Sequence, residues 1–309
     1  MNLSPNIRAS LYMMLSMMGF TVNDSLIKSL DGSLGVSQIM AVRGALLSVL
    51  IGIIIVQQNL HKRLPELLSK KILFRSATEV LATLCFLSAL SILPFATIAA
   101  ILQSLPLAVA VGAAVFLSEP VGWRRWVAIG IGFIGVLIII RPGMNGFQAT
   151  SLLVLLSVVF AAARDLVTRT LPESLPSLLV SAVTTVAICL SGVALTTIQG
   201  DWRPVSSQQL FTLSLASFFL FFGYQFIVMA MRTGEVAYVV PYRYTSLIWA
   251  IALGYLFFNE IPDQLTILGS AIVIATGLFT LYREIVTGRR SVTTTTIGSR
   301  GNVWSERKK

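Results

Sequence analysis

Four charged side chains lie inside or at the end of long apolar stretches of the chain, where ionic groups are rare. Arg43, Glu79 and Arg243 each lie about seven residues into such a stretch, and Asp24 lies near the end of another. At ~1.5 Å of rise per helical residue, the first three would lie roughly 10 Å below a membrane surface. A charge at that depth costs ~3 kcal/mol or more unless a cavity, a partner or a ligand offsets it. These residues are therefore candidates for ion pairing or for binding a charged solute.

Arg43 and Glu79 lie in neighbouring apolar stretches and allow two interpretations. They form a structural ion pair, or they contact a solute directly, and Glu79 is in addition the candidate site for a coupled proton. Because Glu79 is the one deep acid facing two deep arginines, Arg243 is left for an anionic group. A guanidinium binds a carboxylate or a phosphate with two parallel donors, which an ammonium cannot reproduce.

Arg243 is surrounded in the sequence by aromatic residues at helical spacing. Tyr238, Tyr242 and Trp249 would share one stripe of a helix, which Pro241 is expected to kink. Such a stripe suits a solute with a planar or apolar body and a charged end. The predicted substrate-binding residues are Arg43, Glu79, Tyr238, Tyr242, Arg243 and Trp249.

Two acid-then-base pairs recur at a spacing of i, i+4. Asp24 precedes Lys28, and Asp165 precedes Arg169, each near the end of an apolar stretch. This order favours a salt bridge on one helix face. The two pairs are candidate structural ion pairs, or gates, at corresponding places in the chain.

The composition requires lipid as the solvent. The chain has 309 residues, of which 55% are hydrophobic and 12% charged, and its mean hydropathy is +0.83. The net charge of +10 resides mainly between apolar stretches, which indicates membrane topology and excludes a nucleic-acid surface. With the single histidine His61 in a basic loop, and Cys85 and Cys189 in apolar stretches, the sequence predicts no metal site, no catalytic pair and no cofactor.

Apolar stretches bounded by charge, proline or glycine predict an all-α membrane protein of ten transmembrane helices. The spans are expected at residues 8–28, 36–56, 72–91, 95–117, 122–140, 148–169, 176–198, 209–231, 236–258 and 264–282. Lys and Arg gather in alternate loops, such as the one around Lys62, and in the tail. The excess predicts a multi-pass protein of the bacterial inner membrane with both termini in the cytoplasm.

The chain repeats itself with an offset of 141 residues, which places Asp24 on Asp165, Lys28 on Arg169 and Glu119 on Glu260. Because five spans is an odd number, the second copy enters the membrane inverted. We therefore expect a first five-helix repeat at residues 1–145, an inverted second repeat at 146–282, and a disordered basic cytoplasmic tail at 283–309.

The repeated ends of the fourth and ninth spans resemble a known family. Phe116-Leu-Ser-Glu119-Pro recurs as Phe257-Phe-Asn-Glu260-Ile-Pro, and Arg141-Pro-Gly follows the fifth span. Together with the two inverted halves, these motifs are similar to the EamA family of the drug/metabolite transporter superfamily. The resemblance implies alternating-access transport of small metabolites such as amino acids, riboflavin or S-adenosylmethionine, through a central cavity between the halves.

The residues favour a secondary transporter over two alternatives. A membrane-embedded enzyme on lipid or isoprenoid substrates would need paired carboxylates or a histidine–acid motif at a membrane face, and a channel would need a continuous polar stripe along a span. The expected partners are a small-molecule substrate and the lipid bilayer. A monomer and a homodimer both fit the sequence, as do import, export and exchange.

Overall fold

The computed structural model describes residues 4–30, 32–67, 69–119, 122–143, 147–172 and 174–299. Within these ranges the chain forms helices joined by turns and contains no strand, as expected for an all-α protein. The first half comprises α1 (Pro5–Lys28), α2 (Val36–Gln57), the 3-10 helix η1 (Leu60–Leu67), α3 (Lys70–Leu90), α4 (Phe95–Leu102), α5 (Leu105–Phe116) and α6 (Trp123–Ile140). The second half comprises α7 (Ser151–Arg169), α8 (Ser177–Gln199), α9 (Ser207–Thr233), α10 (Val236–Val239), the 3-10 helix η2 (Val240–Tyr244), α11 (Thr245–Phe258) and α12 (Gln264–Ser299).

Eight helical stretches in the described residues are long and apolar enough to cross a membrane, with α4 and α5 together forming one of them. The protein is therefore a multi-pass membrane protein. The two other predicted spans have identifiable departures from a simple apolar helix. α1 carries buried polar residues such as Ser16 and Asn23, and the stretch from Val236 to Phe258 is divided by η2. Ten crossings remain a prediction.

Two spans are interrupted at corresponding places. α4 ends at Leu102 and α5 begins at Leu105, while η2 ends at Tyr244 and α11 begins at Thr245. Leu102 and Arg243 correspond under the repeat offset, as do Leu105 and Ser246. Pro106 and Pro241 lie at these breaks, and each removes a backbone donor. Both halves therefore contain an interruption at the same place, although the two prolines lie at different positions of the repeat.

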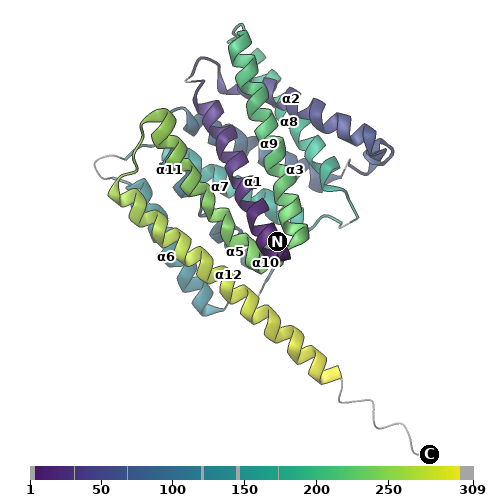
Figure 1. The fold of residues 1–309 in the computed structure, drawn as a ribbon, viewed down its shortest axis with the longest axis vertical. Helices are drawn as coiled ribbons and strands as arrows, with labels where there is room; N and C mark the ends of the chain where they lie inside the picture. The colour runs from purple at the N-terminus through teal and green to yellow at the C-terminus, as the bar shows by residue number, and fades with distance from the viewer. Residues whose placement is uncertain are drawn as a thin grey trace, which may run out of the picture.

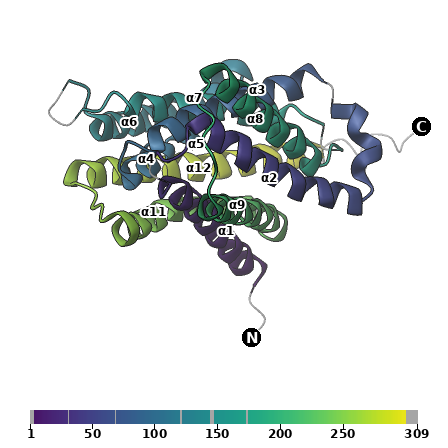
Figure 2. The same cartoon turned by 90° about the horizontal axis from the view of Figure 1, so that it is seen from above.

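The two sequence halves interleave in space. The most extensive helix contacts are α1 with α9, α2 with α8, α6 with α12, and α3 with α7, so each joins one half to the other. The repeat offset takes α1 to α7 and α3 to α9, so the α1–α9 contact corresponds to the α7–α3 contact. The α2–α8 and α6–α12 contacts each join two corresponding helices. Figures 1 and 2 show α1 lying along α9. The contacts therefore follow a pseudo-two-fold arrangement.

Small residues allow α6 and α12, which correspond to each other under the repeat, to approach closely. A Cβ added at Gly135 of α6 would lie 3.0 Å from the carbonyl oxygen of Gly269 on α12. Membrane helices associate through such close packing, because lipid provides no hydrophobic drive for association.

The last helix extends further than expected. α12 continues as helix to Ser299, past the predicted end of its span at residue 282, and leaves the bundle (Figure 1). Helix continues through residues 283–299 because a helix already formed extends by one bond per residue without a new nucleation step, and the disorder of the tail stays a prediction. Residues 300–309 of the predicted tail lie outside the described residues.

Candidate functional site

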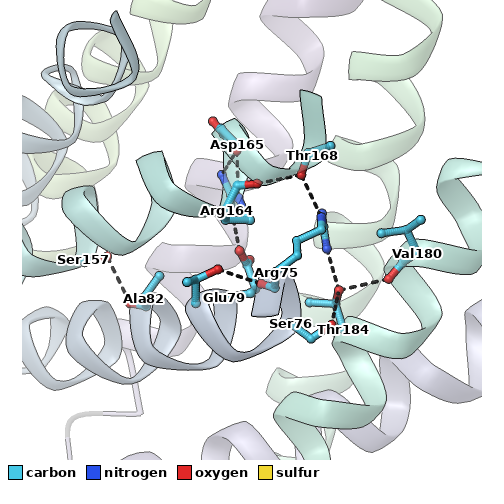
Figure 3. A network of polar contacts seen from close by, with 11 residues as sticks. Arg75, Ser76, Glu79, Ala82, Ser157, Arg164, Asp165, Thr168, Val180 and Thr184 are labelled. Carbon is cyan, nitrogen blue, oxygen red and sulfur yellow. Dashed lines mark hydrogen bonds and ion pairs between the residues drawn. The ribbon is translucent and has the colours of Figure 1, made fainter. Parts of the chain in front are cut away.

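A buried ion-pair network joins α3 to α7. Arg164 Nη1 lies 2.5 Å from Glu79 Oε2, and Arg164 Nη2 lies 2.8 Å from Asp165 Oδ1. The Glu79 and Arg164 side chains are 12% and 22% exposed. Figure 3 shows Arg164 between the two carboxylates, with Glu79 approaching from α3. One guanidinium therefore bridges two acids across the interface between the sequence halves.

Arg75 lies one turn of α3 before Glu79 and reaches towards α7 and α8. Its Nε donates to Thr168 Oγ1 at 2.9 Å, and its Nη1 donates to Thr184 Oγ1 at 2.6 Å (Figure 3). Both partners are neutral hydroxyls, so these contacts leave the positive charge of Arg75 without direct compensation. Arg75 does lie within electrostatic range of Glu79, Asp165 and Tyr224.

Arg43, Asp24 and Arg243 extend this network towards the other helices. Arg43 of α2 is 8% exposed and interacts electrostatically with Asp24 of α1, Tyr224 of α9 and Glu79. Arg243 of η2 interacts with Asp165 and Arg164. The central charge cluster consists of Asp24, Arg43, Arg75, Glu79, Arg164, Asp165 and Arg243. It holds four guanidinium groups and three carboxyl groups, so the guanidinium groups outnumber the carboxyl groups by one.

The two helix breaks meet beside this cluster. Gln103, in the turn between α4 and α5, is 7% exposed, and its Nε2 donates to Ser246 Oγ at 2.8 Å in the first turn of α11. Discontinuous helices that meet at the interface of inverted repeats commonly form the solute sites of transporters, because a broken helix exposes backbone groups to bind a ligand. The arrangement thus places the contact between the two breaks three residues from Arg243.

Glu79 is paired differently from the sequence-based interpretation. Its direct partner is Arg164, while Arg43 stands in longer-range interaction with it. Arg164 was missed as the partner because nothing in the sequence states that α3 packs on α7. The presence of Arg164, Asp24 and Asp165 also corrects the expectation of one deep acid for two deep arginines.

The two i, i+4 pairs do not form as expected. Lys28 pairs with Glu260 at 3.2 Å, and Arg169 pairs with Glu119 at 3.5 Å. Asp24 instead accepts a hydrogen bond from Asn23 Nδ2 at 2.8 Å, and Asp165 pairs with Arg164. Tertiary packing provides closer acids for Lys28 and Arg169, and local i, i+4 pairing contributes only ~0.5 kcal/mol in competition with it.

The predicted aromatic stripe has an exposed part and a part that packs against other helices. Tyr238 is 46% exposed and its ring lies 6.2 Å from that of Tyr242. Tyr242 and Trp249 pack on an apolar cluster of α1 and α9 that includes Met13 and Met17. The Nε1 of Trp249 is buried and has no hydrogen-bond partner among the described residues, so it is an available donor.

A pocket of about 390 Å³ lies between α2, α3 and α8. Its polar lining includes Ser37, Ser88, Gln199 and Asp201, and the Oδ1 of Asp201 is buried without a hydrogen-bond partner among the described residues. Leu84, also in the lining, follows Glu79 by about five residues, or roughly 8 Å along α3. The pocket therefore approaches the central charge cluster from the Lys28 end of the bundle.

Two charged residues at this site were missed as binding candidates: Arg75 and Arg164. Tyr224 is 42% exposed yet interacts electrostatically with Arg43, Glu79 and Arg164 from three other helices. A charged residue in an apolar stretch was the available signal for Arg164. Arg75 already lay inside the expected span at residues 72–91, and α3 begins five residues before it at Lys70.

The sequence is similar to a family of transporters and to individual named transporters. A model of the EamA-like transporter family matches the chain twice, at residues 7–141 and 148–282. An S-adenosylmethionine uptake transporter of Rickettsia conorii is 32% identical over 201 residues, which cover 63% of this chain and 66% of the relative, slightly less than two thirds of its length. A riboflavin transporter of Rhizobium johnstonii is 28% identical over 69% of this chain and 70% of its own.

The fold is also found among solved structures. One crystal structure matches with a TM-score of 0.62 at 14% sequence identity, covering 90% of this chain and 98% of that chain. At this identity the likeness concerns the fold alone.

Proposed function

The chain belongs to the EamA-like transporter family of the drug/metabolite transporter superfamily, and from that premise we propose that it is a secondary transporter of small organic metabolites. The observation that carries this proposal is the central charge cluster, with its seven ionisable groups inside an apolar bundle and beside two helix breaks. Ion pairs buried in this way often destabilise a protein relative to apolar packing, so a binding role accounts for their presence.

We propose ten membrane crossings by adding α1 and the stretch α10–η2–α11 to the eight apolar stretches. α1 packs extensively on α9, which is one of the eight apolar stretches, so α1 shares the depth of a helix that is long and apolar enough to cross. An even number of crossings keeps both termini on one side. The basic residues of the loops favour the cytoplasm for that side and the inner membrane of a bacterium for the location, which makes the Lys28 end external.

The substrate proposed is a metabolite with an anionic or zwitterionic group and a planar or apolar body. The excess guanidinium of the cluster supports the anionic group, and Tyr242 and Trp249 support the ring. S-Adenosylmethionine, which the Rickettsia relative is named for, has an amino-acid end and a planar base. Riboflavin, which the Rhizobium relative is named for, has a planar ring system but no amino-acid group, so it tests the contacts to the ring alone.

Arg243 is the proposed principal group for the anionic end, with Tyr242 and Arg43 beside it. Arg243 interacts with Asp165 and Arg164 at the edge of the cluster, and Arg164 is already held by two carboxylates. Arg243 has no ion pair of that length in the described residues, so its fork is free for a carboxylate or phosphate.

Counterflow in proteoliposomes tests the function and this residue together. Vesicles preloaded with S-adenosylmethionine or riboflavin should accumulate the labelled form with saturable kinetics, which a channel cannot do. Arg243→Lys should reduce exchange of an anionic or zwitterionic solute by about 100-fold, because losing a bidentate charged contact costs roughly 3 kcal/mol. Arg232→Lys, at the exposed end of α9, is the matched control and should exchange normally. Equal exchange by wild type and Arg243→Lys would assign Arg243 a structural role.

A further inference from the structure

Two ion pairs occupy equivalent positions in the two halves. Lys28 Nζ lies 3.2 Å from Glu260 Oε1, and Arg169 Nη1 lies 3.5 Å from Glu119 Oε1. Lys28 and Arg169 are 141 residues apart, and so are Glu119 and Glu260. Each pair therefore joins a cation of one half to an acid of the other, and the repeat exchanges one pair for the other.

The same backbone turn places both acids. Ser118 and Asn259 precede them in the left-handed conformation, each with a φ of 54°. The Glu119 N–H then bonds to the Ala113 carbonyl at 3.2 Å, and the Glu260 N–H bonds to the Gly254 carbonyl at 3.0 Å. This pattern is the helix end in which the chain folds back over the last turn. Each glutamate is thereby fixed beside the helix that brings the cation.

The two pairs lie at opposite ends of the bundle, as contacts with α3 show. Lys28 Nζ donates to the carbonyls of Leu90 and Leu93, at 3.2 and 2.7 Å, where α3 ends. Lys71 Nζ donates to the carbonyl of Thr170 at 3.2 Å, where α3 begins and α7 ends. A helix of 21 residues is roughly 30 Å long, so the pairs are separated by about the thickness of a bilayer's apolar layer.

We propose that Lys28–Glu260 and Arg169–Glu119 are two alternating latches, each holding one end of the transport path closed and each broken when that end opens. The proposal rests on the proposed transporter function. Inverted repeats alternate by moving one bundle against the other around a fixed site. Because each latch connects the two halves at one end only, opening that end separates its charges while the other latch stays closed. The central charge cluster lies between the two.

The latches differ in strength in this structure. The side chains of Lys28 and Glu260 are 10% and 24% exposed, whereas those of Arg169 and Glu119 are 47% and 40% exposed. Glu260 Oε2 also accepts a 2.6 Å hydrogen bond from the Phe95 N–H. Exposed ion pairs contribute little and buried ones more when further bonds satisfy them. Breaking the Lys28 latch should therefore have the larger effect.

Two equivalent reporter sites allow the latches to be tested separately. Ala113 lies beneath Glu119 and is 1% exposed, and Gly254 lies beneath Glu260 at the corresponding position. A Cβ at Gly254 would meet its nearest neighbours at 3.8 Å, which is ordinary contact. With Cys85 and Cys189 replaced by alanine, Ala113→Cys and Gly254→Cys each provide one thiol for a membrane-impermeant maleimide applied to membranes permeable from both sides.

The expected result is reciprocal labelling. Lys28→Met should raise the labelling rate at Gly254→Cys by about tenfold or more and leave or lower the rate at Ala113→Cys, because a latch worth roughly 1.4 kcal/mol shifts the two-state equilibrium by that factor. Arg169→Met should do the opposite with a smaller change. Reversing the charges of each pair should restore the low labelling rates and the size-exclusion chromatography profile of the parent. The reversed pairs are Lys28→Glu with Glu260→Lys, and Arg169→Glu with Glu119→Arg.

Other outcomes overturn the proposal. If each single variant raises labelling at both reporters together, the pairs stabilise the fold without controlling an end. If the folded variants label like the parent, or if the reversed pairs stay open, the ion pairs do not hold the ends closed. The labelling needs no solute, so the latches can fail while counterflow succeeds, and they can hold while every solute tested in counterflow fails.

Discussion

The α3–α7 and α1–α9 interfaces are related by the repeat, and they use different chemistry. α3–α7 holds the ion pairs of Arg164 with Glu79 and Asp165. At α1–α9, Ser16 Oγ donates to the Gly223 carbonyl at 2.7 Å, and Phe20 packs edge-to-face on Tyr224 with ring centroids 5.2 Å apart. Arg164 corresponds to Asn23, and Glu79 corresponds to Leu220.

This contrast separates what the fold needs from what a solute needs. Both interfaces pack extensively, so helix association at this position does not require charge. Asp24 and Asp165 are retained in both halves, and each accepts a hydrogen bond at 2.8 Å from the residue before it, Asn23 or Arg164. The charges added on one side only, Glu79 and Arg164, are therefore the ones that the duplicated fold can do without. We expect them to serve binding.

The largest effect should come from unpairing the α3–α7 charges. Arg164→Gln leaves both Glu79 and Asp165 without their close partner and should lower stability by about 3 kcal/mol, since an uncompensated buried charge is costly. Glu79→Gln should cost less, because Arg164 keeps Asp165. The double variant Glu79→Gln with Arg164→Gln should recover part of the stability of the parent, because Glu79 no longer carries an unpaired charge while Asp165 still lacks Arg164. Thermal unfolding of the three purified proteins measures this order, and a double variant no more stable than Arg164→Gln would contradict it.

A smaller loss should follow from crowding the α1–α9 interface. A Cβ at Gly223 would lie 2.7 Å from two carbon atoms of the Phe20 ring, so Gly223→Ala must displace the ring or separate the helices. Overpacking of this kind costs about 1–3 kcal/mol. The melting temperature should fall while the folded fraction keeps the parent's KM for its solute. A changed KM with an unchanged melting temperature would place Gly223 in the binding site.

The smallest effect is expected for the hydroxyl at the same interface. Ser16→Ala removes the bond to the Gly223 carbonyl, and interhelical hydrogen bonds in membrane proteins contribute only about 0.6 kcal/mol on average. The melting temperature should drop slightly, with Ser10→Ala as the control, because the Ser10 hydroxyl bonds within its own helix to the Asn6 carbonyl. A drop as large as that of Arg164→Gln would remove the distinction between the two interfaces.

Much of the fold followed from periodic features of the sequence. Long apolar stretches and the 141-residue offset indicated helices, a membrane and two repeats, because hydrophobic length and repetition are local properties. The partners of Glu79, Lys28 and Arg169 could not be obtained in this way. Each depends on which helices pack together, and helices of similar hydropathy give no local signal of their neighbours. The offset relates Glu119 to Glu260 and Lys28 to Arg169, but only the packing shows that each cation pairs with the acid of the other half.

The most direct test of the account compares solute exchange by Glu79→Gln with Arg164→Gln and by Gly223→Ala in proteoliposomes of equal folded protein content. S-Adenosylmethionine and riboflavin are the solutes, each measured as counterflow with the parent alongside. The account predicts that the neutral double variant remains folded and exchanges neither solute, whereas folded Gly223→Ala exchanges the parent's solute with the parent's KM. Normal exchange by the neutral double variant would contradict the claim that the central charge cluster, which includes these charges of α3–α7, forms the solute site.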